Sequence, residues 1–195
     1  QYKMPLVELV KDFSARGSGI NEFFYPKRPY LDEDGRLWVA DRNNRRVKGV
    51  KPEESPIIVE GTALTEFVAK EGNHLVIGYD DKGIEVCNLA DGHRREHDIG
   101  RKGDACFHNG KVYAINGVQD DSVYQLPEFR VVAALDDPTH FIASDQNKLF
   151  VATYSYKTRT YRFHVLTLNE QKPIGKNKLP FEIGDMVDFD VDGKL

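Results

Sequence analysis

Five ionisable side chains recur along this chain at intervals of 36 to 45 residues, namely Arg28, Glu66, Asp104, His140 and Asp185. Carboxylate oxygens are the ligands that calcium prefers, and histidine is the commonest general base near neutral pH. If the fold brings equivalent positions together, these side chains form one polar ring. The ring would bind a ligand. Alternatively, Glu66, Asp104 and Asp185 would hold a calcium ion with His140 as a base, although Arg28 would repel a cation.

The strands that would position the ring recur at a similar spacing. A turn followed by a short strand occurs five times, and the anchor residues of these strands lie 38, 37, 37 and 46 residues apart: Leu37, Leu75, Val112, Leu149 and Leu195. Asp-Gly and Asn-Gly turns favour tight hairpins, and further segments with period two follow the anchors. Repeats of about 40 residues with several short strands are typical of a β-propeller. We therefore expect an all-β fold of antiparallel blades with up to four strands.

The alternation also predicts the core, with these residues buried: Leu37, Val39, Leu75, Ile77, Val112, Ala114, Leu149 and Val151. Residues 1–195 are expected to form a single propeller domain. It would contain the outer strand of one blade at 6–13, about four blades, and the start of another at 186–195. Because a propeller ring closes within one blade, we expect an incomplete portion of a larger ring. The missing blades would come from the rest of a longer chain or from another chain.

Residues 13–50 carry a more specific pattern of glycine, aromatic, proline, Asp-Gly and Val-Ala-Asp positions. The pattern falls on Gly17, Gly19, Phe23, Pro26, Leu31, Gly35, Val39, Ala40, Asp41, Asn44, Arg46 and Val47. This segment resembles an NHL repeat, while later copies keep only the strand skeleton. The resemblance implies a six-bladed ring. It also implies the calcium-dependent hydrolase alternative, because several six-bladed lactonases and phosphotriesterases hold calcium at the channel, and an RNA-binding alternative.

Two acidic motifs in this segment have structural explanations. Asp41 and Arg46 bracket a turn, where a charge-assisted hydrogen bond would tie the hairpin. The run from Asp32 to Gly35 begins like a calcium loop. However, the sixth and twelfth positions of such a loop would be Leu37 and Asn43 instead of glycine and glutamate. We therefore expect a reverse turn and no metal there.

Tyrosines crowd the segment 154–161, which is longer than its counterparts. The segment is polar and carries Tyr154, Tyr156 and Tyr161, which is the composition of a contact loop. Longer loops on a rigid scaffold often carry function. The alternative is an ordinary hairpin with its tyrosines packed along the strands. Cys87 and Cys106 are expected to be buried free thiols, with a disulfide as the alternative, so the cellular compartment stays open.

The composition narrows the function classes. Hydrophobic residues make up 40% and charged residues 30%, as in soluble globular proteins, and no apolar run is long enough to span a membrane. The net charge of −4 gives no reason to expect nucleic acid binding, and no nucleophile–base motif is present. The favoured prediction is a non-enzymatic scaffold that binds a protein or a small ligand, without a cofactor. Calcium enters only with the hydrolase alternative, and RNA binding is the least favoured.

Overall fold

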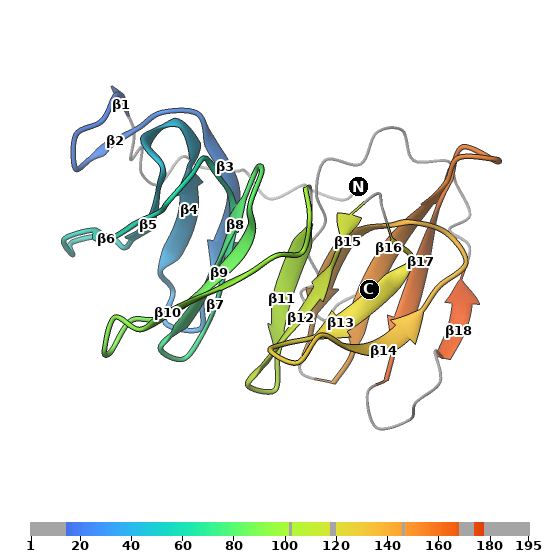
Figure 1. The fold of residues 1–195 in the computed structure, drawn as a ribbon. Coiled ribbons are helices and arrows are strands. Elements are labelled where there is room, and N and C mark those ends of the chain that lie inside the picture. The colour runs from blue at the N-terminus through green and yellow to red at the C-terminus, as the bar shows by residue number, and fades with distance from the viewer. Residues whose placement is uncertain (1–14, 102, 118–119, 146, 168–173, 178–195) are drawn as a thin grey trace, which may run out of the picture.

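The computed structural model describes residues 15–167, apart from 102, 118–119 and 146, together with residues 174–177. Sixteen of its strands form four antiparallel sheets of four strands, arranged as the blades of a β-propeller (Figure 1). This confirms the predicted fold class. Within the described ranges the helical residues are the 3-10 turn η1 (Arg42–Asn44) and Gly117, and a short parallel pair, β1 (Ala15–Arg16) and β2 (Glu22–Phe23), precedes the first blade. The expected segments 6–13 and 186–195 lie outside the described residues.

The strands follow one another across each blade in sequence order. The first blade consists of β3 (Pro26–Leu31), β4 (Leu37–Asp41), β5 (Arg46–Val50) and β6 (Ile57–Glu60). The second consists of β7 (Thr65–Glu71), β8 (His74–Tyr79), β9 (Gly83–Asn88) and β10 (Arg94–His97). The third consists of β11 (Asp104–His108), β12 (Lys111–Ile115), β13 (Ser122–Gln125) and β14 (Arg130–Ala134). The fourth consists of β15 (Thr139–Ser144), β16 (Leu149–Ser155), β17 (Thr160–Leu166) and β18 (Ile174–Asn177).

The first strand of each blade is the inner one. Strands β3, β7, β11 and β15 lie side by side in that order and line a common central cavity. Strands β7, β11 and β15 each begin after the connection from the preceding blade, and Arg28 near the start of β3 donates to Asp104 at the start of β11. The starts of all four strands therefore share one end of the channel. We call this end the mouth. The hairpin turns that follow the inner strands lie at the opposite, far end of the blades.

The hydrophobic core lies between neighbouring blades. Trp38 and Val47 of the first blade pack with Leu75 and Ile77 of the second, and two further clusters join the second blade to the third and the third to the fourth. Seven of the eight predicted core anchors are buried, but Leu37 is only half-buried.

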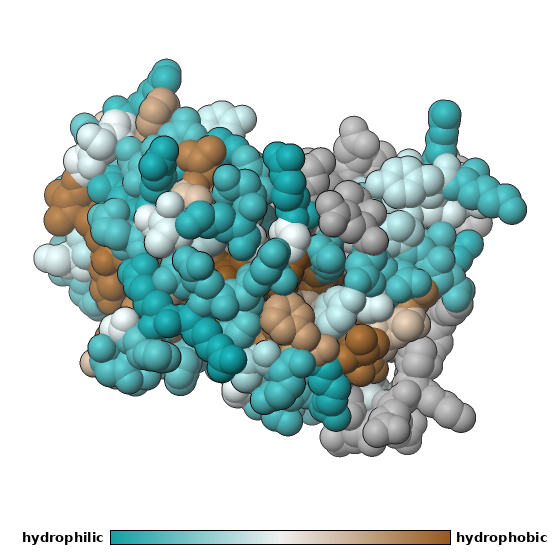
Figure 2. Space-filling model, viewed as in Figure 1, coloured by the Kyte–Doolittle hydropathy of each residue, from teal (hydrophilic) through white to brown (hydrophobic). Residues whose placement is uncertain are grey.

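The prediction for Leu37 was wrong because Leu37 lies on the face of the first blade that points away from the second blade. It joins a small cluster with Phe23, Val39 and Val50. Leu31, which pairs with Leu37, is 65% exposed. Hydrophobic residues gather accordingly at the left edge of Figure 2, where β5 and β6 lie.

The first far-end turn is built around a buried carboxylate. Asp32 Oδ1 accepts hydrogen bonds from the backbone N–H groups of Asp34 and Arg36 at 3.0 and 2.8 Å, and Gly35 has φ of 72°. Its Oδ2 accepts from Trp38 Nε1 at 2.8 Å and lies 3.2 Å from Lys70 Nζ. Burial alone would raise the pKa of Asp32, but hydrogen bonds from Trp38, Arg36 and Lys70 hold it below its usual value. The segment is a reverse turn, as the sequence indicated.

Carboxylates also join the far-end turns of successive blades. Glu33 of the first blade accepts from the N–H of Gly72 at 3.2 Å, and Glu71 of the second accepts from the N–H of Gly110 at 2.7 Å. Both bonds span 39 residues, so the same device is repeated one blade later. Each such carboxylate fixes the position of the next turn.

Asp41 and Arg46 form the expected structural pair. Arg46 Nε donates to Asp41 Oδ2 at 2.8 Å, with the aspartate fully buried. Arg46 also donates to the backbone oxygens of Gly19 and Glu22, and Lys48 Nζ donates to the same Glu22 oxygen. These cations therefore hold the segment before the first blade and are not displayed to solvent.

Cys87 and Cys106 are buried free thiols, as predicted. Among the residues that the structure describes, no helix has the length and apolarity to cross a membrane.

The inter-blade core predicts a large difference between two identical substitutions. Leu149→Ala removes a fully buried side chain and should lower the free energy of unfolding by about 2–5 kcal/mol. Leu31→Ala removes a side chain that is 65% exposed and should cost less than about 1 kcal/mol. Urea unfolding of both variants measures the difference. Equal losses of stability would contradict the burial of Leu149 and the exposure of Leu31 described above.

Candidate functional site

The four described residues of the candidate ring lie at the mouth. Arg28 is in β3, Glu66 in β7, Asp104 begins β11, and His140 is in β15. All four are within the first three residues of their strands, so one end of the channel carries them. Asp185 lies outside the described residues.

Asp104 is the most constrained of these side chains. It is 2% exposed and receives both terminal nitrogens of Arg28, at 3.0 and 3.2 Å. Its Oδ1 also accepts from its neighbour's N–H, on Ala105, at 2.9 Å, and its Oδ2 accepts from the N–H of Ile142 at 3.1 Å. The Arg28 guanidinium crosses the second blade on its way, 4.9 Å from the centroid of the Phe67 ring. One carboxylate therefore joins the first, third and fourth blades.

Glu66 is paired with cations from the first blade. Its two oxygens accept from Lys27 Nζ and Arg42 Nε, each at 2.5 Å, and Arg42 also donates to Asp80 at 2.9 Å. The hydrogen bond to Glu66 is the largest cause that raises the pKa of Arg42 above its ordinary value, so the guanidinium stays charged. Neither Lys27 nor Arg42 was singled out as a partner of Glu66 in the sequence.

The two described ring carboxylates are thus both neutralised by protein cations. A calcium site needs several oxygens that point to one position and carry negative charge to it. Within the described part of the chain, no group of three or more histidine, cysteine or acidic side chains is arranged to hold a metal ion. The geometry of Glu66 and Asp104 suits ion pairing between blades.

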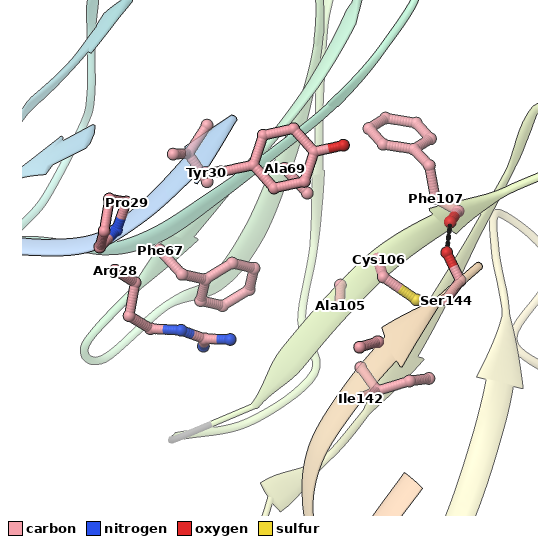
Figure 3. Close-up of a pocket in the computed structure, with 12 residues that line it drawn as sticks. Arg28, Pro29, Tyr30, Phe67, Ala69, Ala105, Cys106, Phe107, Ile142 and Ser144 are labelled. Atoms are coloured by element: carbon pink, nitrogen blue, oxygen red, sulfur yellow. Dashed lines mark hydrogen bonds between the residues drawn. The ribbon is translucent and has the colours of Figure 1, made fainter. Parts of the chain in front are cut away.

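Below the mouth lies a cavity of about 90 Å³. Arg28, Tyr30 and Phe67 line one side of it and Cys106, Ile142 and Ser144 the other (Figure 3). The Ser144 hydroxyl donates to the backbone oxygen of Phe107, which draws β15 to β11. Burial, and then the charge of Asp104, raise the pKa of Cys106, so its thiol stays protonated and is a poor nucleophile. The volume suits a few water molecules rather than an organic substrate.

His140 belongs to a different environment from the other ring residues. Its ring centroid lies 5.5 Å from that of Tyr154, 5.6 Å from that of Tyr161 and 6.4 Å from that of Tyr156. Tyr154 is 4.9 Å from Tyr161 and 5.0 Å from Tyr156. We call these four residues the aromatic cluster. The spacings are those of offset and edge-to-face ring pairs.

The strands explain why the aromatic cluster forms at the mouth. Tyr154 and Tyr161 face each other across β16 and β17, and Thr153 pairs with Thr139, next to His140. Tyr156 follows β16 in the turn and is 60% exposed, whereas the other three rings are half-buried. The sequence identified His140 as a ring residue and the tyrosines as a contact loop. Their common cluster was missed, although the turn at 156–159 already implied that Tyr154 and Tyr161 pair.

Comparison with known proteins is limited to the fold. No family model and no curated protein sequence matches the chain. Among solved structures it is similar to virginiamycin B lyase from Staphylococcus aureus (12% identity, TM-score 0.57, covering 80% of this chain and 56% of that one). It is also similar to Kuenenia stuttgartiensis hydrazine synthase (12%, 0.62, 91% and 53%) and to a streptogramin B lyase (14%, 0.57, 80% and 55%). The chain spans about half the length of these β-propeller structures.

The buried Asp104 carboxylate predicts a specific loss of stability. Asp104→Asn removes the charge that pairs with Arg28 and replaces one accepting oxygen with a donor, so the free energy of unfolding should fall by about 2 kcal/mol. Asp81→Asn makes the same change at an exposed site in the β8–β9 turn and should change it by less than about 0.5 kcal/mol. Urea unfolding compares the two variants, and the Arg28–Asp104 linkage between blades is wrong if both behave alike.

Proposed function

We propose that this chain is a non-enzymatic binding domain that uses the mouth of its propeller to hold a protein or a small ligand. The observation that carries the proposal is the aromatic cluster. Four rings stand at the mouth, three on neighbouring strands and Tyr156 in the turn between β16 and β17, and Tyr156 is the most exposed, at 60%. Aromatic rings give a large contact area at a low cost in conformational entropy, which is why tyrosine is frequent in binding surfaces. The ligand is a molecule that presents a flat apolar face, such as an aromatic or sugar ring.

The surroundings of the cluster support a rigid binding surface. Tyr154 packs between Tyr156 and Tyr161, so one ring is held by two others. Next to the cluster, Arg162 forms a 3.0 Å ion pair with Asp137 in the connection from the third blade. A surface that is ordered before binding loses little entropy when the ligand arrives.

The calcium-dependent hydrolase is the alternative function. It requires Glu66, Asp104 and Asp185 to bind one ion, with His140 as a base. Pairing of Glu66 with Lys27 and Arg42, and of Asp104 with Arg28, favours the binding domain. Two of the similar solved structures are lyases, so the fold alone is compatible with catalysis. An RNA-binding role has the least support, because Arg42, Arg46 and Lys48 are engaged within the protein.

Completion of the ring is part of the same proposal. The chain covers 53% to 56% of the propellers to which it is similar, and the side of the first blade that faces away from the second carries the exposed Leu31 and the small cluster that includes Leu37. An apolar sheet face of this kind is normally covered by another element. Further blades from the rest of a longer chain or from another chain would cover it, and an NHL-like ring would have six blades.

A ligand-detected NMR screen with sugars and small aromatic compounds tests the role of the aromatic cluster. Tyr156→Ala should weaken the best ligand about tenfold, which corresponds to the roughly 1.4 kcal/mol expected for one stacking partner. Tyr25→Ala is the matched control, because Tyr25 is also exposed, at 62%, but lies before β3 and outside the cluster. The proposal fails if no compound binds at the cluster or if both substitutions have the same effect.

A further inference from the structure

A second concave surface lies between the second and third blades. It is a cleft of about 500 Å³, within the range of small-molecule sites. One wall comes from β8, β9 and β10 and the other from β12, β13 and the turn after β13. The turns that border it, at 89–93 and 109–111, are at the far end of the blades. The cleft is therefore separate from the mouth and from the aromatic cluster.

The floor of the cleft is apolar. Val112 and Leu126 are buried there, and Val86 is half-buried against them. His97 continues the floor on the β10 side, where burial, followed by the nearby charge of Arg95, lowers the pKa of its imidazole. These groups suit the apolar body of a ligand.

Two cations stand over this floor from opposite walls. Arg95 lies on β10, between His93 and His97 and on the same side of the strand, and Lys111 begins β12 on the facing blade. Both side chains are exposed, and neither forms an ion pair with any residue that the structure describes. At the mouth, by contrast, Lys27, Arg28 and Arg42 are paired with carboxylates.

Two acidic groups also line the cleft, equal in number to the two cations, and neither forms an ion pair with Arg95 or Lys111. Asp91 is occupied within its own turn, where it accepts from the N–H of His93 at 2.8 Å and from the Asn88 amide at 3.1 Å. Glu128 is at the exposed edge, in the turn after β13. The three histidines of the cleft, His74, His93 and His97, are not arranged as metal ligands, since no metal-holding group occurs in the described part of the chain.

We propose that this cleft binds a small organic anion with an apolar body, of the aromatic carboxylate class. Arg95 and Lys111 hold the carboxylate from the two blades, and the ring of the ligand packs on Val86, Val112 and Leu126. An inorganic anion would use the cations but leave the floor uncovered, and a cation of the same shape would make no ion pair with Arg95 or Lys111. The chemistry therefore requires both the charge and the ring.

Titration of the isotope-labelled chain, followed by amide NMR shifts, tests this with three probes. Benzoate should give saturable shifts at residues of the cleft, inorganic phosphate should bind at least about tenfold more weakly, and benzylamine should give no shifts there. The double variant Arg95→Gln/Lys111→Gln should weaken benzoate about tenfold or more, because it removes both charged hydrogen bonds to the carboxylate. Both positions are exposed, so the variant should keep the fold.

Lys82→Gln is the matched control, because Lys82 is an exposed cation of the second blade in the β8–β9 turn at the mouth. It should leave benzoate binding unchanged. The proposal is overturned if benzoate shifts residues elsewhere, if phosphate or benzylamine matches benzoate at the cleft, or if Lys82→Gln weakens binding as much as the double variant. None of these outcomes depends on the aromatic cluster, so failure here and failure of the proposed function are distinguishable.

Discussion

The arrangement of the blades depends on a buried carboxylate at the channel mouth. Asp104 lies where the inner strands of the first, third and fourth blades approach one another. It can be charged there because Arg28 and two backbone N–H groups satisfy its oxygens. A buried carboxylate is costly unless it is paired in this way. The blades that supply these partners are therefore held at fixed distances from β11.

This constraint determines what the mouth can do. The charges that the sequence concentrates there are used in joining blades: Arg28 to Asp104, and Lys27 and Arg42 to Glu66. Side chains with this duty are poor candidates for binding an ion or transferring a proton, because a change in their charge would weaken the blade contacts. The aromatic cluster does not join the first three blades to one another. The binding that we propose and the joining of the blades thus use different residues of one surface.

The periodic part of this architecture could be predicted from the sequence. Turn residues followed by alternating strands identified four blades, and the Asp41–Arg46 pair and the reverse turn at Asp32 followed from local spacing. These features depend on residues within one hairpin. The burial of Leu37 was predicted wrongly because it depends on whether a neighbouring blade covers this side chain. The alternation within the strand carries no information on such a neighbour.

Contacts between blades were harder to predict from the sequence. The choice of Lys27 and Arg42 as partners of Glu66 depends on the angle between two sheets, and the association of His140 with the tyrosines depends on a shift in register at Thr139–Phe141. Neither the angle nor the shift has a signal in residue spacing. The unpaired cations of the far-end cleft could not be found for the same reason, because Arg95 and Lys111 belong to different blades.

The carboxylates of Glu33 and Glu71 have a consequence for how the repeat can vary in length. Each reaches the backbone of the turn one blade further on, at Gly72 and Gly110. An added residue in one of these turns would move the N–H away from its acceptor and would disturb the next blade as well. The far-end hairpins therefore keep the number of residues in successive repeats nearly constant. This accounts for the spacing of the anchors on the second strands of the first three blades, Leu37, Leu75 and Val112, which lie 38 and 37 residues apart although the sequences have otherwise diverged.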